Sequence, residues 1–330
     1  MVERAQGYAE TWLITGGCGF IGTSLIQRLQ TEGPGIRIRV LDNLSVGSRK
    51  DLAEVCTVGE TDGDPSHSVT LVEGDIKDYE TCLDCCEGAD VIVHLAANTG
   101  VGPSVEDPRA DMEANIIGTF NLLEAARQKQ VSRFIFASSG APIGECEPPI
   151  HEEKAPRPVS PYGASKLAGE GYCSAYYRTF GIKTVSLRFG NVYGPRSTHK
   201  GSVVAKFIRR TIEGKTCEIY GDGTQTRDFI YIDDLTEAII KAVKSDVGGE
   251  VFQIATSKEH TVNEVAEMLK ARLEKCGFEM KTEYGASRLG DVKRNFSDTS
   301  KAEKQLGWKA QVELNEGLGK SVEWFVGRRT

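Results

Sequence analysis

Short apolar runs alternate with amphipathic stretches through the first half of the chain. The apolar runs predict strands at residues 12–15, 36–41, 69–72, 91–95, 134–137 and 184–187. Between them, residues 20–30 and 114–128 place an apolar side chain at every third or fourth position, which predicts amphipathic helices. Strands that alternate with helices in this way are typical of a parallel, doubly wound α/β sheet, in which the helices are the crossover connections.

The second half of the chain is less regular. Helical periodicity returns at residues 203–213, 235–243, 262–275 and 314–328, with short strands between them. Thr261 and Glu264 form a capping-box pattern, which predicts that a helix begins directly after Thr261. We expect a smaller C-terminal α/β lobe over residues 189–330, and a larger domain over residues 1–188 to which residues 228–256 return.

Composition and charge exclude several classes of function. Of the 330 residues, 39% are hydrophobic and 26% are charged, which is enough for a packed interior. The net charge of −7 repels a polyanion, so we expect no nucleic-acid partner. No stretch approaches the ~20 apolar residues of a membrane span, and the acidic start lacks the order of charged and apolar residues of a signal peptide. We expect a cytoplasmic protein without membrane contact.

Nine cysteines are scattered along the chain, an odd number that suits reduced thiols better than a disulfide framework. Cys82, Cys85 and Cys86 form a cluster that could ligate a metal. A tetrahedral site would need a second Cys/His pair at the usual spacing, and the sequence has none. We therefore expect no metal, and buried or half-buried thiols on one helix.

A glycine-rich turn follows the first predicted strand. Gly16, Gly19 and Gly22 are spaced by three residues, and the predicted helix begins within this motif. The first glycine allows a tight turn, the second lets the backbone approach a pyrophosphate, and the third lets helix and strand pack closely. Such a triplet also arises by chance in turn-rich loops, but between a strand and a helix it predicts a dinucleotide site at the helix N-terminus.

Acidic residues at the ends of the next two strands narrow the choice of dinucleotide. Asp42 ends the second strand about twenty residues beyond Gly22, where its carboxylate can accept from both hydroxyls of an adenosine ribose and would repel a 2′-phosphate. NAD is therefore favoured over NADP as the cofactor. Asp75 and Ile76 follow the third strand and could hold the adenine edge, although an Asp at this place could equally be a turn residue.

Tyr162 and Lys166 follow a helix-start signal, in which Ser160 can cap the helix and Pro161 fits its first turn. Their spacing of four residues puts both side chains on one helix face. A phenol with a pKa of about 10 is a poor base at neutral pH unless a cation stabilises the phenolate, a role for Lys166 and for the nicotinamide's own charge. The pair then predicts a proton acceptor for a substrate hydroxyl. The alternative is an incidental pair on a surface helix.

Two serines end the preceding strand. The hydroxyl of Ser138 or Ser139 can hydrogen-bond the same substrate oxygen and complete a Ser, Tyr, Lys arrangement. The serine that faces away would then belong to an ordinary Ser-Gly loop.

Taken together, these motifs resemble the extended short-chain dehydrogenase/reductase family, and within it the UDP-sugar 4-epimerases related to UDP-glucose 4-epimerase. The likeness runs over nearly the whole chain, residues 13–324. The further motifs that carry it are His94-Leu95-Ala96-Ala97, Asn115 with Gly118-Thr119, and residues 187–195, 226–229 and 288–291.

The resemblance implies a Rossmann-like fold with a substrate lobe, and roles for individual residues. Ser139, Tyr162 and Lys166 would be catalytic. NAD would be bound by Gly16, Gly19, Phe20, Ile21, Gly22, Asp42, Asn43, Asp75, Ile76, Ala96, Ala97, Tyr162 and Lys166. A UDP-sugar would be bound by Ser139, Asn191, Arg227, Arg288, Asp291 and Asn295. The two arginines would form bidentate pairs with the diphosphate, although either alone could be a surface residue. A homodimer is also implied, through helices near residues 116–126 and 167–177.

Departures from the family pattern bear on the reaction and on the sugar. Relatives that are dehydratases or decarboxylases carry an acid just after the catalytic Ser or Thr. Gly140 and Ala141 stand there in this chain, which argues against elimination and decarboxylation. Asn295 occupies the position that gates an N-acetyl group, and it is neither the large Tyr nor the small Cys of familiar cases. Thr198 stands where an Arg would meet the carboxylate of a uronic acid.

The expected function is NAD-dependent 4-epimerisation of a UDP-sugar of the UDP-glucose/UDP-galactose type, through a transient 4-keto intermediate, which makes the chain an isomerase. UDP-glucuronate and UDP-N-acetylglucosamine 4-epimerases are alternatives, and so is a nucleotide-sugar dehydrogenase or reductase that releases NADH in each cycle. A different class is a sensor that binds NAD and a partner without catalysis. The intact Ser139, Tyr162 and Lys166 argue against the sensor.

Overall fold

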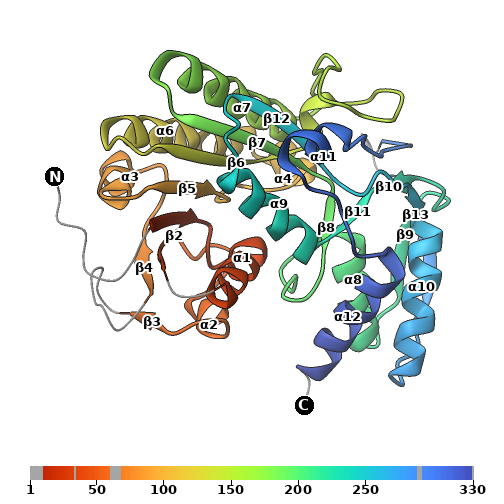
Figure 1. The fold of residues 1–330 in the computed structure, drawn as a ribbon. Helices are drawn as coiled ribbons and strands as arrows, with labels where there is room; N and C mark the ends of the chain where they lie inside the picture. Colours follow the sequence, from red (N-terminus) through yellow and green to blue (C-terminus); the bar gives the residue numbers. More distant parts are fainter. Residues whose placement is uncertain (1–9, 33–34, 60–67, 288–291, 329–330) are drawn as a thin grey trace. The chain divides into compact units, whose positions relative to one another are not determined.

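The computed structural model describes residues 10–32, 35–59, 68–287 and 292–328 (Figure 1). Its backbone contacts divide the chain into two compact units. The first unit comprises Met1–Gly144, Ala155–Arg188 and Ile239–Phe252, and the second comprises Glu145–Lys154, Phe189–Ala238 and Gln253–Thr330. The chain therefore returns to the first unit twice after leaving it.

The first unit is built on a sheet with the strand order β12-β7-β6-β5-β1-β2-β4-β3. Its strands are β1 (Glu10–Thr15), β2 (Ile36–Asp42), β3 (Val58–Gly59), β4 (Val69–Glu73), β5 (Val91–His94), β6 (Arg133–Ser139), β7 (Lys183–Phe189) and β12 (Glu250–Ile254). The neighbours β1 and β2, β1 and β5, β2 and β4, and β5 and β6 pair in parallel. The six predicted strands are all present, and the predicted Rossmann-like, doubly wound fold is confirmed.

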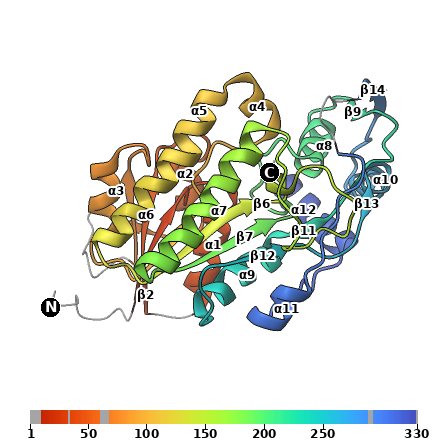
Figure 2. The ribbon, with the colours of Figure 1, turned by 90° about the horizontal axis from the view of Figure 1, so that it is seen from above.

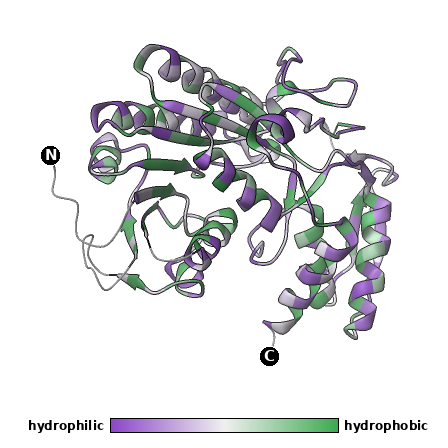
Figure 3. Ribbon diagram, viewed as in Figure 1, coloured by the Kyte–Doolittle hydropathy of each residue, from purple (hydrophilic) through white to green (hydrophobic). Residues whose placement is uncertain are grey.

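The central strands are buried on both faces. Leu13 and Ile14 are consecutive residues of β1 and both are fully buried, as are Ile92 and Val93 of β5. Because consecutive side chains of a strand point to opposite faces, such a run must be covered by helices on both sides. Figure 3 shows β5 mainly in the colour of hydrophobic residues, which is why such a short run is visible in the sequence.

Helices cover the two faces of this sheet. The long ones are α1 (Phe20–Thr31), α3 (Tyr79–Cys86), α6 (Gly118–Gln128) and α7 (Pro161–Phe180), and the short ones are α2 (Arg49–Ala53), α4 (Val101–Glu106), α5 (Pro108–Met112), the π-helix η1 (Glu113–Ile117) and the 3-10 helix η2 (Ala141–Ile143). Residues of α3, α6 and α7 share one hydrophobic core with β1, β5 and β6. Figure 2 shows α6 and α7 side by side, and Figure 1 shows α1 on the opposite side of the sheet.

The cysteine cluster belongs to this core. Cys82, Cys85 and Cys86 lie on α3 and are buried, as predicted for thiols on one helix. Burial raises the pKa of the Cys82 thiol to about 12, so it stays protonated at neutral pH. Among the described residues, no group of three or more His, Cys, Asp or Glu side chains is arranged to hold a metal ion.

The second unit combines helices with small sheets. Its helices are α8 (Val203–Ile212), α10 (Val262–Lys275), α11 (Ser300–Leu306) and α12 (Leu314–Gly327), and α9 (Ile232–Lys244) begins in this unit and ends in the first. Its strands pair as β8 (Asn191–Tyr193) with β11 (Phe229–Tyr231), β9 (Cys217–Tyr220) with β14 (Thr282–Gly285), and β10 (Thr226–Arg227) with β13 (His260–Thr261). The predicted capping box is present, because Thr261 accepts from Glu264 N and the Glu264 side chain accepts from Thr261 N.

Residues 145–154 belong to the second unit, although both neighbouring segments of the chain belong to the first. Ile150 N donates to Phe296 O at 2.9 Å, and Asp298 N donates to Ile150 O at 2.8 Å, which forms a parallel bridge. The Glu152 carboxylate accepts from Gln253 N at 2.7 Å. This segment is therefore held by backbone pairing rather than by its own secondary structure. In the part of the chain that the structure describes, no helix is long and apolar enough to cross a membrane.

Candidate active site

The glycine turn after β1 is closed so tightly that side chains would not fit. Gly16 has a φ of +68°, and a Cβ on it would lie 2.8 Å from Ala96 N. A Cβ on Gly22 would lie 2.5 Å from Gly16 O. Gly19 is the N-cap residue of α1, so the positive end of the helix dipole opens at this turn. This arrangement fits a dinucleotide's pyrophosphate, which needs close approach to the backbone at a helix N-terminus.

Phe20 and Ile21 form the first turn of α1 and are half-buried. Asp42 ends β2 and is buried, with its carboxylate fixed from two sides. One oxygen accepts from Cys18 N at 2.9 Å, and the other accepts from Leu44 N at 2.9 Å. Since a carboxylate can accept about four hydrogen bonds, both oxygens retain acceptor capacity for ribose hydroxyls.

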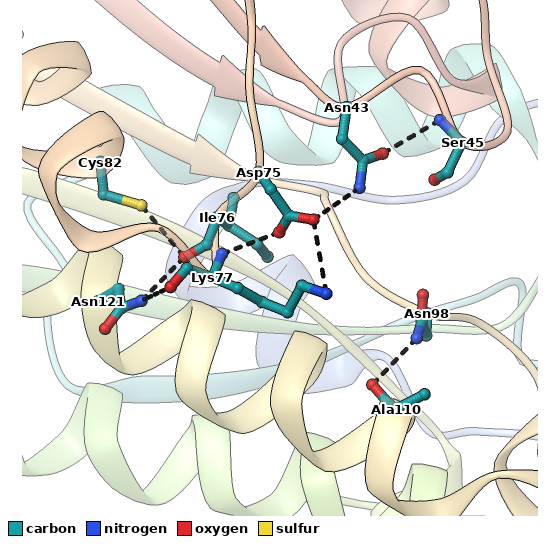
Figure 4. Close-up of polar contacts among 9 residues, drawn as sticks. All are labelled: Asn43, Ser45, Asp75, Ile76, Lys77, Cys82, Asn98, Ala110 and Asn121. Atoms are coloured by element: carbon teal, nitrogen blue, oxygen red, sulfur yellow. Dashed lines mark hydrogen bonds and ion pairs between the residues drawn. The ribbon is translucent and has the colours of Figure 1, made fainter.

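Asn43 and Asp75 lie beside each other at the ends of β2 and β4 (Figure 4). Asn43 Nδ2 donates to Asp75 Oδ2 at 3.2 Å, and Asn43 Oδ1 accepts from Ser45 N at 3.1 Å. Asp75 Oδ1 accepts from Lys77 N at 2.9 Å, and its other oxygen lies 3.7 Å from Lys77 Nζ. Asp75 therefore stabilises a turn, which is one of the two roles that the sequence allowed for it. Its contact with the adenine stays a prediction.

Ile76 is placed differently from its neighbour Asp75. The Ile76 side chain is buried in the hydrophobic core, where a Cβ on Gly118 would lie 2.5 Å from its Cδ1. Its carbonyl accepts from Asn121 Nδ2 at 3.0 Å, as Figure 4 shows. The side chain therefore faces the core, and only the backbone of Ile76 remains for the predicted cofactor contact.

His94 connects the glycine turn to the loop after β5. The imidazole is 1% exposed, with Nδ1 2.7 Å from Thr15 Oγ1 and Nε2 3.0 Å from Thr119 Oγ1. Thr119 Oγ1 donates to Asn115 O at 2.6 Å, so it must accept from His94 Nε2–H. Thr15 Oγ1 accepts from Ala96 N at 3.2 Å and donates to Nδ1. The network thus selects one neutral tautomer of His94 and fixes the backbone N–H of Ala96. The next residue, Ala97, is half-buried.

The pKa of His94 agrees with this network. Burial, and to a smaller extent the charge of Lys166, lower it to about 3. No role beyond its motif could be predicted for His94, because the burial of an isolated histidine is not visible in a sequence. Its signal lies in its place at the end of a buried strand.

Tyr162 and Lys166 lie in the first two turns of α7, which begins as predicted. Ser160 is the N-cap, and its Oγ accepts from Gly163 N at 3.1 Å. Lys166 is 3% exposed, and its Nζ donates to Ala137 O at 2.9 Å. The same Nζ lies 5.9 Å from the centre of the Tyr162 ring. The ammonium is therefore near the phenol ring, but a backbone carbonyl holds it.

Burial dominates the ionisation of both groups. It raises the pKa of Tyr162, which lies at about 12, while Ser139 acts to lower this pKa and the charge of Asp111 acts to raise it. Burial lowers the pKa of Lys166 to about 8, against the charge of Asp111, which raises it. In the chain alone, desolvation of the phenolate dominates, so the pKa of Tyr162 lies above its ordinary value. That Lys166 and the charge of a bound nicotinamide stabilise the phenolate stays a prediction.

The two serines at the end of β6 face different partners. Ser138 is 3% exposed and donates to Glu170 Oε1 at 2.6 Å. Ser139 is half-buried and accepts from Ala141 N at 3.2 Å, and it acts to lower the pKa of the Tyr162 phenol. The structure thus brings Ser139 to the phenol and directs Ser138 into the interior.

Three of the predicted substrate residues lie in the second unit, and each is half-buried. Asn191 begins β8, and its N donates to Asp228 O at 2.8 Å. Arg227 donates from Nη1 to Thr226 O and to Val292 O, both at 2.7 Å. Asn295 N donates to Thr226 Oγ1 at 3.4 Å, so Arg227 and Asn295 share a neighbour. Arg288 and Asp291, which were also predicted to bind substrate, lie outside the described residues.

A protein-family model matches residues 12–255, which include the glycine turn, Asp42 and the Ser139, Tyr162 and Lys166 set. Its description is the NAD dependent epimerase/dehydratase family. The chain belongs to this family. NAD is therefore its cofactor, and the predicted resemblance is confirmed.

Individual members of the epimerase/dehydratase family match nearly the whole chain. A UDP-glucose 4-epimerase of Mycolicibacterium smegmatis is 36% identical, over 95% of this chain and 97% of the relative. The crystal structure of a UDP-glucose 4-epimerase of Thermotoga maritima with UDP-glucose has a TM-score of 0.87 at 35% identity, and the match covers 97% of this chain and 100% of that one. Human dTDP-D-glucose 4,6-dehydratase is 31% identical, over 97% of this chain and 91% of the relative. The chain is therefore similar both to epimerases and to a dehydratase.

Proposed function

We propose that this chain is a UDP-sugar 4-epimerase, and that UDP-glucose and UDP-galactose are its substrate pair. The observation that supports this proposal is that Ser139 acts on the Tyr162 phenol and that the buried Lys166 ammonium lies 5.9 Å from the centre of its ring, in a chain whose family uses NAD. A hydroxyl donor, a phenol and an ammonium are the groups that removal of a proton from a sugar hydroxyl requires. The names of the two epimerases among its relatives point to the same reaction.

Each side chain has one task in the proposed mechanism. NAD, when bound, supplies the hydride acceptor and donor. Tyr162 removes the proton of the C4 hydroxyl and later returns a proton to the same oxygen, while Ser139 orients that oxygen. The charge of Lys166 favours the phenolate. The 4-keto sugar turns about its diphosphate linkage between the two steps, so that its configuration at C4 is inverted without net oxidation.

The residues after Ser139 favour epimerisation over elimination. Gly140 and Ala141 carry no carboxylate, and among the described residues a Cβ on Gly140 would have no heavy atom within 4 Å. Loss of water from a sugar needs an acid and a base at adjacent carbons, and this stretch of the chain supplies neither. A dehydratase activity, as named for the human relative, is therefore not our proposal.

We assign the nucleotide of the substrate to the second unit. Arg227 and Arg288 are the proposed contacts to the diphosphate, since a guanidinium can pair with two phosphate oxygens. Asn191 and Asp291 are proposed to bind the uridine side, and Asn295 the sugar. A local pair of arginines would offset the net charge of −7, which by itself repels an anion.

We also propose that the partner of this chain is a second copy of itself. Large apolar side chains are exposed along η1, α6 and α7 of the first unit, namely Ile117 at 43%, Phe120 at 37%, Tyr172 at 40% and Phe180 at 49%. Phe120 and Tyr172 already contact each other edge to face, with ring centres 5.7 Å apart. An apolar surface shared by two neighbouring helices is the kind that pairs with its own copy.

The first experiment incubates the purified chain with UDP-glucose, UDP-N-acetylglucosamine and UDP-glucuronate separately, with and without added NAD. Products are resolved by chromatography and proton NMR. We expect conversion of UDP-glucose to its 4-epimer and no lasting change in absorbance at 340 nm. Steady NADH formation would instead indicate a dehydrogenase, and a 4-keto-6-deoxy product would indicate a dehydratase. If none of the three sugars is changed, the proposal is wrong for these substrates.

Tyr162→Phe tests the proposed proton acceptor. We expect turnover to fall by about 100-fold or more, because the group that takes the proton is lost, while NAD remains bound. Tyr172 lies on the same helix and its ring is exposed. Tyr172→Phe is therefore the matched control, and its turnover should equal that of the parent chain. Equal activity of Tyr162→Phe and the parent chain would rule out the assigned role.

A further inference from the structure

Asp111 is a buried carboxylate to which the sequence pattern assigned no role. It lies on α5 and is 3% exposed. Its Oδ1 accepts from Asn115 Nδ2 at 2.8 Å. Because the Asn115 amide is neutral, this hydrogen bond holds the carboxylate in place without cancelling its charge. A buried carboxylate is stabilised by a cation in its neighbourhood.

Hydrogen bonds lead from Asp111 to the turn of α7 that carries the reacting groups. Asn115 Nδ2, besides its bond to Asp111, lies 3.3 Å from Ser165 Oγ. Ser165 Oγ donates to Tyr162 O at 3.0 Å. Ser165 is the residue between Tyr162 and Lys166 that faces this network, and it is 1% exposed. The Asp111 carboxylate is therefore connected to the backbone of Tyr162 through two buried side chains.

The cation on which the charge of Asp111 acts is Lys166, which follows Ser165 on α7 and is 3% exposed. The charge of Asp111 is the strongest of those that raise the pKa of Lys166, and Glu170 acts in the same direction more weakly. Glu170, however, is held by Arg188 through two bonds of 2.8 and 2.7 Å, and both residues are buried. The charge of Glu170 is thus matched by Arg188, whereas Asp111 is held by a neutral amide.

The other titratable groups near Lys166 are uncharged at neutral pH. His94 on β5 is neutral, since burial lowers its pKa to about 3. Cys173 on α7 is protonated, since burial raises the pKa of its thiol to about 12. The Tyr162 phenol is protonated in the chain alone. Among the described groups that act on Lys166, Asp111 is thus the carboxylate left to balance its charge.

We propose that Asp111 is a positioning residue of the active site: its carboxylate is the counter-charge of the Lys166 ammonium and, through Asn115 and Ser165, it holds the turn of α7 that carries Tyr162. This inference rests on the proposed function, because it assumes that Tyr162 and Lys166 act in turnover. Its consequence is electrostatic. The negative charge of Asp111 raises the pKa of Tyr162 and the pKa of Lys166, so it shifts the pH range in which the two groups support turnover to higher pH.

The test replaces Asp111 by Asn, which keeps the size of the side chain and the acceptor oxygen for Asn115. We expect both limbs of the profile of kcat/KM against pH to move to lower pH by about one unit, because the pKa of each group falls when the negative charge is removed. Asp111→Glu, which restores the charge, should move the limbs back. Glu106→Gln removes an equal charge from an exposed position on α4 and should leave the profile unchanged.

A second measurement does not depend on turnover. The pKa of Lys166 is followed by NMR of the NAD-loaded chain with ¹³C-labelled lysine, and Lys166→Arg identifies the resonance. We expect a lower pKa in Asp111→Asn than in the parent chain. If no nucleotide sugar is converted by the parent chain, the proposed function fails, while this titration still tests Asp111. If Asp111→Asn does not fold, Asp111→Ser replaces it. A lower kcat with an unmoved pH profile and an unmoved Lys166 pKa would overturn the inference.

Discussion

At the scale of the residue, the burial of His94 makes the stability of the fold depend on pH. The folded imidazole has a pKa of about 3, whereas an unfolded one titrates at about 6.5. Between these values the unfolded chain binds a proton that the folded chain does not. We therefore expect this group to lower the free energy of unfolding as the pH falls below about 6.5, by at most about 1.4 kcal/mol per pH unit.

His94→Gln should flatten this dependence. The free energy of unfolding is measured with urea at pH 7 and at pH 5 for the parent chain, for His94→Gln and for His199→Gln. The last of these is the control, because the His199 side chain is exposed. We also expect His94→Gln to lose about 1–3 kcal/mol at pH 7, because Thr15 or Thr119 loses a buried partner. The same pH dependence in all three chains would show that His94 does not carry the effect.

At the scale of the element, the glycine turn decides how closely α1 approaches β1. Gly22→Ala would place a Cβ 2.5 Å from both Gly16 O and Gly17 Cα, which are backbone atoms of the turn. Overpacking of this kind costs about 1–3 kcal/mol, and it would displace the N-terminus of α1 from its place at the pyrophosphate. We expect a lower melting temperature and at least about tenfold weaker NAD binding, as 1.4 kcal/mol corresponds to a factor of ten.

Gly327→Ala is the matched control for this substitution. Gly327 ends α12, and among the described residues a Cβ on it would have no heavy atom within 4 Å. The NAD affinity of Gly327→Ala is measured by calorimetry on a chain from which bound nucleotide has been removed. It should equal that of the parent chain. If Gly22→Ala also binds NAD as the parent does, the close approach at this turn is not needed for the cofactor.

At the scale of the whole molecule, the exposed apolar surface of α6 and α7 predicts self-association. Phe120→Glu places a charge in the middle of this surface, where burial against a second copy would be costly. We expect a dimer for the parent chain and a monomer for Phe120→Glu by light scattering, with unchanged circular dichroism. Tyr284→Glu changes an exposed aromatic residue of the second unit and should leave the dimer intact. A monomeric parent chain would contradict the proposed partner.

Much of this protein could be predicted from local patterns. The strands were visible because a strand buried on both faces contains a continuous apolar run, and β1, β5 and β6 are of this kind. The glycine spacing, the capping box at Thr261 and the spacing of Tyr162 and Lys166 are also local, since each depends on residues within one or two helical turns. For the same reason Asp42 could be placed at the end of its strand.

Only the tertiary structure decided how these groups ionise and what surrounds them. Burial, which depends on the packing of distant segments, raises the pKa of Tyr162 and lowers that of Lys166, and neither effect can be seen from their spacing alone. It also selects one tautomer of His94 and brings Asp111 to α7 from an earlier helix. The sequence by itself determined the elements and their motifs because these follow from near neighbours, whereas electrostatics in the interior depends on contacts that form only on folding.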